Sequence, residues 1–463
     1  MGAAKFSPRI LWLILADAAI LYGGVILAMH IRLGSAGTIY ELNFRNGWIK
    51  IGLASSVCVL ILYFYDLYDY IVMTNRRELL LRLVQALGIA WALLALVFYL
   101  FPPLMIGRGV SVISVPLVLV LLLSWRIFIH TLTGHPGIGE KILVVGTGQT
   151  ALDTAEAVWE RRDAGYRIVG FVSENGAKPG EKLGRSDILG KAHDLEKVIR
   201  SEKIDRVVIA VRDRRGAFPT EALLKMSLAG DVSIEECTSF FERITGKVHV
   251  DMLRPSWLIF AGRRRDSPIK MVFRETTHRL LALLGLVISL PVAILTAILI
   301  KIDSRGPIFY KQERVGMNGA IFNVIKFRSM KTDAEADGEP IWAASNDQRT
   351  TRVGKVIRKL RIDEIPQFWN ILKGEMNFVG PRPERPHFVE QLAREIPYFE
   401  HRHLVAPGLT GWAQIKYPYG ASVSDAMQKL QYDLYYIKNQ SLTLDLMIVF
   451  ETVKTVLFRK GGR

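Results

Sequence analysis

The sequence predicts a membrane protein of the α plus α/β class. The expected order is a four-helix transmembrane bundle, a Rossmann-like middle domain, and a re-entrant membrane helix with a mainly helical C-terminal domain. Three observations support this. Half of the 463 residues are hydrophobic and gather in long runs, a strand–glycine turn–helix pattern follows the fourth run, and the net charge is +16. A strongly basic chain favours anionic lipid, phosphorylated ligands or nucleic acid.

The transmembrane bundle is predicted within residues 1–139. A bilayer core of roughly 30 Å needs about 20 apolar residues, and the runs that meet this are Ile10–Ile31, Trp48–Tyr65, Leu79–Phe101 and Val110–Thr131. The first run is too long for a signal peptide and lacks a cleavage site, so we expect a membrane anchor. Asp17 lies inside it, and a hydrogen bond to a neighbouring helix is favoured over a functional role.

Lysine and arginine determine the predicted topology, because they concentrate in cytoplasmic loops. The cations on one side of the runs are Lys5, Arg9, Arg76, Arg77, Arg82, Arg126 and Lys141. The alternate loops are poorer in cations. We therefore expect a cytoplasmic N-terminus and a chain that returns to the cytoplasm near residue 140.

A small α/β domain is predicted over residues 140–265, with strands at "KILVV", "YRIVGFV", "DRVVIAV" and "DVSIEE". Gly146, Gly148 and Ala151 follow the G-x-G-x-x-A pattern, whose turn brings backbone amides to a pyrophosphate at a helix N-terminus. Glu174, after the second strand, could meet a ribose hydroxyl. The alternative is a tight turn that binds no cofactor.

A fifth apolar segment, Leu280–Ile300, opens the C-terminal region at residues 266–463. If it crossed the membrane, the basic residues after it would lie outside, against the lysine and arginine bias. Pro291 at its midpoint removes a backbone hydrogen bond and bends a helix. The segment is therefore predicted to enter and leave by the cytoplasmic face, although a kinked spanning helix also fits its periodicity.

An adjacent acid pair, Asp363 and Glu364, stands in "RIDEIPQFWNIL". Asp363 is predicted to be a helix N-cap that stays ionised, because helix N-termini carry partial positive charge and Arg358 and Arg361 lie nearby. An ionised carboxylate can attack phosphorus, and Glu364 could hold Mg²⁺ beside substrate phosphates. Ordinary helix capping is the alternative.

Cations near this pair suit phosphate recognition. Lys326 and Arg328 stand in "KFRSM", and Arg382 lies between two prolines in "VGPRP". Nucleic acid is not expected as a partner, because zinc-ligand spacing and RNA-binding signatures are missing. The two cysteines, Cys58 and Cys237, do not form a disulfide framework and indicate a reducing compartment.

The C-terminal motifs "GPIFYKQERVG", "KFRSM", "RIDEIPQFWNILKGEMNFVGPRP", "PGLTGWAQI" and "YDLYYIKNQSLTLDL" resemble one family. It is the polyprenyl-phosphate hexose-1-phosphate transferases of the bacterial sugar transferase type, in the large membrane form. The stretch "YPYGASVSDA" is similar to an exopolysaccharide branch associated with exosortases. Relatives break the re-entrant helix at a Ser-Pro pair, whereas Leu290 precedes Pro291 here. Asn377 stands where many relatives carry serine.

The resemblance implies transfer of sugar 1-phosphate from a UDP-sugar to undecaprenyl phosphate, with release of UMP. UDP-glucose is the expected donor, with UDP-galactose second. Asp363 would attack the β-phosphorus, and Glu364 with Asp363 would hold Mg²⁺. The implied phosphate-binding residues are Arg358, Lys326, Arg382, Arg328 and Asp433. The catalytic domain would face the cytoplasm at the bacterial inner membrane, and a homodimer is left open.

Two other functions are weighed. A membrane-tethered nucleotide-sugar dehydratase or epimerase needs a Tyr-x-x-x-Lys pair, which does not occur in the sequence. A non-catalytic scaffold for polysaccharide assembly predicts that Asp363→Asn leaves polymer output intact.

Overall fold

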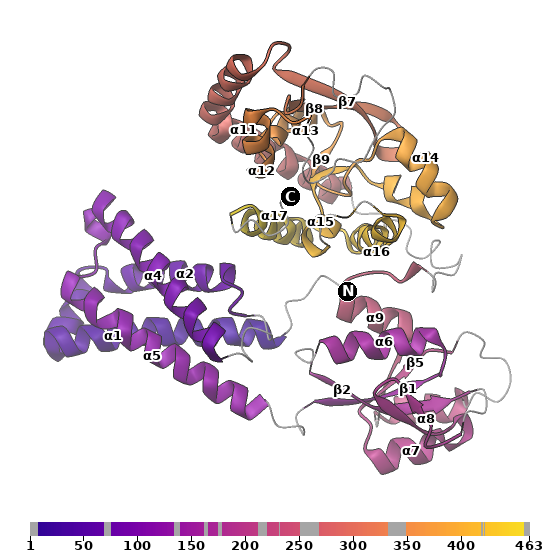
Figure 1. Cartoon of the computed structure of the whole chain (residues 1–463). Helices are drawn as coiled ribbons and strands as arrows, with labels where there is room; N and C mark the ends of the chain where they lie inside the picture. The colour runs from indigo at the N-terminus through magenta and orange to yellow at the C-terminus, as the bar shows by residue number, and fades with distance from the viewer. Residues whose placement is uncertain are drawn as a thin grey trace. The chain divides into compact units, whose positions relative to one another are not determined.

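The computed structural model describes residues 8–68, 76–133, 139–161, 165–174, 178–211, 220–230, 232–250, 268–331, 349–417, 420 and 422–457. The chain divides into two compact units that meet in the sequence between Glu235 and Glu236. The described residues up to Glu235 form the N-terminal unit, and those from Glu236 form the C-terminal unit (Figure 1).

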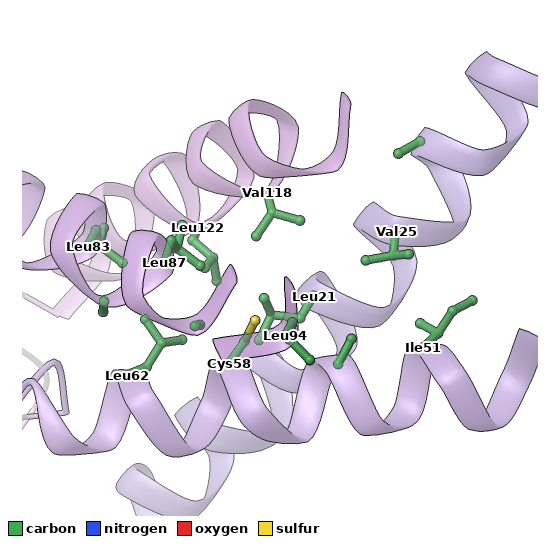
Figure 2. Packing of buried hydrophobic residues seen from close by; sticks show 14 of the residues in the cluster. Leu21, Val25, Ile51, Cys58, Leu62, Leu83, Leu87, Leu94, Val118 and Leu122 are labelled. Carbon is green, nitrogen blue, oxygen red and sulfur yellow. The ribbon is translucent and has the colours of Figure 1, made fainter. Parts of the chain in front are cut away.

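The N-terminal unit begins with long apolar helices. They are α1 (Pro8–Phe44), α2 (Gly47–Phe64), α4 (Arg76–Leu100) and α5 (Arg108–Thr133), with the short 3₁₀ turn η1 (Pro102–Leu104) before α5. Each of the four long helices is long and apolar enough to cross a membrane. Figure 2 shows their buried contact, where Leu21 of α1, Leu62 of α2, Leu87 of α4 and Leu122 of α5 belong to one hydrophobic cluster.

Helix α1 continues past Ile31, where the sequence predicts a loop. Gly34 has a left-handed backbone (φ 70°), and helical structure resumes after it as far as Phe44. The hydroxyl of Thr38 donates to the Gly34 carbonyl at 2.9 Å. Glycine tolerates this backbone because it has no Cβ, so the chain kinks there and remains helical.

The predicted hydrogen bond from Asp17 to a neighbouring helix is confirmed. The Arg126 guanidinium on α5 donates to the Asp17 carboxylate on α1 and to the Leu67 carbonyl after α2. Neither side chain of this ion pair is exposed, and the Arg126 Cζ lies 4.9 Å from the centre of the Tyr68 ring. One arginine thus joins three segments of the helical cluster.

The α/β part of the N-terminal unit contains a six-stranded mixed sheet. Its elements are β1 (Glu140–Val145), α6 (Gln149–Glu160), β2 (Tyr166–Ser173), β3 (Lys182–Leu183), β4 (Ser186–Lys191), η3 (Ala192–Asp194), α7 (Leu195–Glu202), β5 (Arg206–Ile209), α8 (Thr220–Ala229) and β6 (Ser233–Glu236). The strand order is β3-β4-β2-β1-β5-β6. Strand β1 pairs in parallel with β2 and β5, and β4 pairs in parallel with β2.

The four strands expected from sequence are present, and the sequence analysis missed a hairpin. Strands β3 and β4 pair antiparallel, with Leu183 opposite Ser186. Gly184 in the two-residue turn has φ 61°, which is the conformation that such turns need. The glycine in "KLGRS" was therefore the available signal.

The C-terminal unit is mainly helical with two small sheets. Its elements are α9 (Cys237–Thr245), α11 (Pro268–Asp303), β7 (Phe309–Val315), η5 (Met317–Gly319), β8 (Ile321–Phe327), α12 (Arg352–Lys359), η6 (Ile362–Glu364), α13 (Gln367–Lys373), β9 (Asn377–Val379), α14 (Pro386–Glu395), η7 (Phe399–Leu404), β10 (Gly408–Thr410), α15 (Trp412–Lys416), α16 (Val423–Asn439) and α17 (Leu442–Leu457). Strands β7 and β8 form an antiparallel hairpin, and β9 pairs in parallel with β10.

Helix α9 packs with the last helices of the C-terminal unit. The Trp412 indole donates to the Gly246 carbonyl at 2.7 Å, and the Lys438 ammonium donates to Glu242 at 2.7 Å. Gly246, which follows α9, has φ 69°, and a Cβ there would lie 3.1 Å from the Trp412 ring. The residues directly after β6 thus already belong to the packing of this unit.

Helix α11 touches other elements of the C-terminal unit both before and after Pro291. Before it, Ala282 packs with Ile371 and Met376. After it, Ile300 packs with Phe327 and Ile357. Several apolar side chains between these contacts are exposed, with Val287 at 62% and Ile288 at 76%. The helix is therefore held on both sides of Pro291, and exposed apolar side chains lie between the two contacts.

Candidate active site

The acid pair lies in the 3₁₀ turn η6, between α12 and α13. Arg361, just before the turn, has a left-handed backbone (φ 58°). Helix α13 begins only at Gln367, and Pro366 is the residue before it. The predicted N-cap at Asp363 is therefore wrong. The left-handed Arg361 starts a separate tight turn, and Asp363 lies inside it.

Asp363 is a buried carboxylate with an unused acceptor. Its exposure is 9%, and its Oδ1 has no hydrogen-bond partner in the part of the chain that the structure describes. Burial, aided by the charge of Glu364, raises the pKa of Asp363 to about 6, against the charges of Lys326, Arg361 and Arg382. At neutral pH the group is mainly ionised, and a carboxylate with such a pKa is more basic than an ordinary one.

Glu364 is held by arginines. Its Oε1 accepts from Arg382 Nη2 at 2.8 Å and from Arg361 Nη1 at 3.5 Å. Burial alone would raise the pKa of Glu364, but the charges of Arg382, Lys326 and Arg361 outweigh it and lower the pKa to about 2. Neighbouring carboxylates whose pKa values are driven apart in this way are suited to different roles.

Lys326 supplies a third cation, from strand β8. Burial, with the charge of Arg382, lowers the pKa of Lys326 to about 8, and the charges of Glu364 and Asp363 oppose this shift. Lys326 is therefore still mainly protonated at neutral pH. A partly desolvated ammonium beside two carboxylates suits an incoming phosphate, because charge interactions strengthen as water is excluded.

The structure brings together Asp363, Glu364, Lys326 and Arg382 from the predicted set. Three other predicted phosphate-binding residues have partners within the protein. Arg358 donates to the Thr350 hydroxyl at 3.2 Å, and the Asp433 carboxylate accepts from Arg402 at 2.9 Å. Arg328 donates to the carbonyls of Ser304 and Arg305 at the end of α11.

The sequence analysis missed two arginines that contact the turn carrying Arg382. Arg314 on β7 donates to the Pro383 carbonyl at 3.0 Å, and Arg402 in η7 donates to the Arg382 carbonyl at 3.0 Å. Both hold the backbone of the turn that carries Arg382. Arg314 stands in the motif "GPIFYKQERVG", but local patterns do not show that either arginine reaches the turn, because each comes from a distant part of the sequence.

The predicted glycine turn in the α/β part has a compact geometry. Gly146 has φ 127°, and a Cβ there would lie 3.2 Å from the Ala210 Cβ. Gly148 precedes α6, and Ala151 is buried inside that helix. The Thr147 amide donates to the Glu174 carboxylate at 3.1 Å. The Glu174 carboxylate therefore accepts a hydrogen bond from the turn itself, whereas the sequence analysis expected that it could meet a ribose hydroxyl.

Comparisons with known proteins match two parts of the chain. The model of the family described as "Bacterial sugar transferase" matches residues 269–459, and that described as "CoA-binding domain" matches residues 64–216. The chain is 42% identical over 261 residues to an Aeromonas hydrophila protein named UDP-N-acetylgalactosamine-undecaprenyl-phosphate N-acetylgalactosaminephosphotransferase. The matched residues are 56% of this chain and 61% of that protein.

Two further relatives extend the match. The undecaprenyl-phosphate glucose phosphotransferase of Komagataeibacter xylinus is 33% identical over 347 residues, covering 72% of this chain and 62% of that protein. The exopolysaccharide production protein PSS of Rhizobium leguminosarum bv. phaseoli is 37% identical over 189 residues, covering 39% of this chain and 93% of that protein. The chain belongs to the bacterial sugar transferase family. It spans about three fifths of the length of the Aeromonas and Komagataeibacter proteins.

Proposed function

We propose that this protein transfers sugar 1-phosphate from a UDP-sugar to undecaprenyl phosphate and so initiates exopolysaccharide synthesis. The observation that carries the proposal is the buried Asp363 carboxylate, whose Oδ1 has no hydrogen-bond partner among the described residues. Beside it stand three cations, Lys326, Arg361 and Arg382. A nucleophile needs an available lone pair, and a diphosphate needs cations.

In the first step an Asp363 carboxylate oxygen attacks the β-phosphorus of the UDP-sugar. The bond between this phosphorus and the bridging oxygen breaks, and UMP leaves with the electron pair. In the second step an oxygen of undecaprenyl phosphate attacks the phosphorus of the aspartyl phospho-sugar. The Asp363 carboxylate is released, and undecaprenyl-diphosphate-sugar is the product. Lys326 and Arg382 balance the charge of the transferring phosphoryl group throughout.

Magnesium fits the residues present. Mg²⁺ prefers one or two carboxylates together with substrate phosphate oxygens, and the unused Asp363 Oδ1 beside Glu364 supplies such acceptors. Asp363 and Glu364 would hold the ion, and when bound it would neutralise negative charge on the phosphates. Groups of three or more metal-ligating side chains are not found among the described residues.

The finer architecture is also proposed. Four N-terminal crossings and a Rossmann-like middle domain follow from the helix lengths and the parallel strand pairs. Helix α11 is proposed to enter and leave the cytoplasmic leaflet of the inner membrane, because Ala282 and Ile300 both pack within one unit while Ile288 between them is exposed. A helix that crossed fully could not keep contacts with one domain on both sides of its exposed segment.

UMP release tests the proposal directly. Purified full-length protein would be given undecaprenyl phosphate, Mg²⁺ and a panel of UDP-sugars. UDP-glucose stays the first expectation, and UDP-galactose and UDP-N-acetylgalactosamine complete the panel. We expect UMP from at least one donor and none from Asp363→Asn. Full release from that variant would mean that another group is the nucleophile, and no release from the native protein with any donor would support the scaffold alternative. Light scattering of the same preparation distinguishes a monomer from a homodimer.

A further inference from the structure

The turn from Pro381 to Glu384 is held at every backbone carbonyl. The four donors are Gly408 N to Pro381 O at 2.9 Å, Arg402 Nη2 to Arg382 O at 3.0 Å, Arg314 Nη1 to Pro383 O at 3.0 Å and Val315 N to Glu384 O at 2.9 Å. These donors come from distant parts of the sequence. Prolines at two positions restrict the backbone further. The turn is therefore fixed by tertiary contacts on several sides.

The side chain that this turn presents is Arg382. It donates to the Glu364 carboxylate at 2.8 Å, and its charge acts on Asp363 and Lys326 as well. The contacts that hold the backbone of the turn therefore also fix the position of the guanidinium. A movement of the turn would displace the guanidinium relative to both carboxylates. Misplacement by about 1 Å at such a site can cost about a hundredfold in rate.

Arg402 is held in turn by Asp433. Arg402 Nη2 donates both to the Arg382 carbonyl at 3.0 Å and to Asp433 Oδ2 at 2.9 Å. Arg402 is 6% exposed and Asp433 is 1% exposed, and the Arg402 Cζ lies 5.1 Å from the centre of the Phe399 ring. A buried guanidinium needs a carboxylate partner. Asp433 therefore compensates the buried charge of Arg402 and orients its guanidinium at the turn.

We propose that Asp433 and Arg402 are positioning residues that set the place of Arg382 at the acid pair, and that neither binds substrate phosphate. The proposal rests on the proposed function. It reassigns Asp433, which the sequence predicted to bind phosphate. The geometry supports this because the Asp433 carboxylate is paired with Arg402, and both side chains are too buried to contact a ligand.

The test uses the full-length protein with the active donor of the panel. We expect Asp433→Asn and Arg402→Lys each to lower kcat by about tenfold to a hundredfold, with little change in the KM of the UDP-sugar. The double variant loses no more than either single variant, because the two residues act as one unit.

A matched control is Glu242→Gln, which breaks an ion pair that also ends on α16, with Lys438 at 2.7 Å. It should leave kcat unchanged. Amide exchange provides a readout without turnover. Asp433→Asn should speed exchange at Gly380 and Gly408, whose amides bond across the turn to Thr410 and Pro381.

The outcomes separate the two proposals. If the native protein is active and Asp433→Asn raises the KM with kcat unchanged, Asp433 binds phosphate and the positioning proposal is overturned. An unchanged kcat with unchanged amide exchange overturns it too. If the native protein releases no UMP from any donor, the proposed function fails, and faster exchange at Gly380 would still support the positioning role.

Discussion

One acid–arginine arrangement in each unit of this protein invites comparison, and the two differ in how exposed their side chains are. The Asp17–Arg126 pair between apolar helices has both side chains at 0% exposure. In the C-terminal unit, the Glu364 side chain is 12% exposed while its partners Arg382 and Arg361 are 28% and 40% exposed. The first arrangement is sealed and joins helices. The second leaves its cations open to a ligand, which is what phosphoryl transfer requires.

The largest expected effect breaks the open arrangement. Asp363→Asn keeps the shape of the side chain and removes its charge, so the proposed nucleophile is lost. We expect UMP release to fall by on the order of 10⁴-fold. Thermal unfolding and UDP-sugar binding of the variant are the controls, because both should persist. Activity above a tenth of the native value would contradict the nucleophile assignment.

The next effect breaks the sealed arrangement. Arg126→Met leaves the Asp17 carboxylate buried without its partner, and we expect a loss of about 3 to 5 kcal/mol in unfolding free energy. Replacing both residues, as in Asp17→Leu with Arg126→Met, should recover most of this loss. Denaturation in detergent measures the unfolding free energy of the single and the double variant. Equal losses in the single and double variants would show that the ion pair is not the cause.

The acid pair itself should show opposite effects on stability. Asp363 has its folded pKa raised to about 6, so its contribution is present at low pH and is lost as the pH rises through 6. Glu364 has its folded pKa lowered to about 2, so its contribution is present above its ordinary pKa and is lost as the pH falls through 2. At pH 7 we expect Asp363→Asn to stabilise and Glu364→Gln to destabilise, each by about 1 to 3 kcal/mol.

Thermal unfolding at pH 7 and pH 4 checks these signs. The gain from Asp363→Asn should shrink at pH 4, because the native carboxyl is then mainly protonated. A destabilised Asp363→Asn at pH 7 would mean that the carboxylate is better solvated than its burial indicates.

Activity should also follow the raised pKa. Because only the ionised Asp363 attacks, kcat/KM should begin to fall near pH 6 and then decrease by about tenfold per pH unit. Glu364, with its pKa near 2, stays charged over this range. A pH–rate profile between pH 4.5 and 8 measures this. An acid limb near pH 4 would contradict the buried nucleophile.

The smallest effect is expected at an exposed pair in the membrane part. Arg45, directly after α1, and Glu41 near the end of that helix lie 3.2 Å apart, with Arg45 61% exposed. Such pairs contribute about 0.3 to 0.5 kcal/mol, so Glu41→Gln should change the unfolding free energy by no more than that. The unfolding free energies of Glu41→Gln and Arg126→Met, measured in the same detergent, compare the loss of an exposed ion pair with the loss of a buried one. Similar losses in the two would remove the contrast between sealed and exposed pairs.

Much of the fold follows from patterns that are local in the sequence. Long apolar runs require membrane-length helices, and alternating short apolar runs with glycine turns require a sheet flanked by helices. The errors also have local causes. Gly34 allowed α1 to continue where a loop was predicted, and Arg361 entered a left-handed conformation that no residue preference announces. Because of that conformation, Asp363 lies in a 3₁₀ turn and not at an N-cap.

The sequence by itself determined which chemical groups are available: an acid pair, basic motifs around it, and apolar helices to bring them to a membrane. Only the tertiary structure decided which groups meet. It placed Lys326 and Arg382 at the acid pair, and it paired Asp433 with Arg402. The physical reason is that charges interact according to their separation and burial, and residues far apart in the sequence acquire both only when the chain is packed.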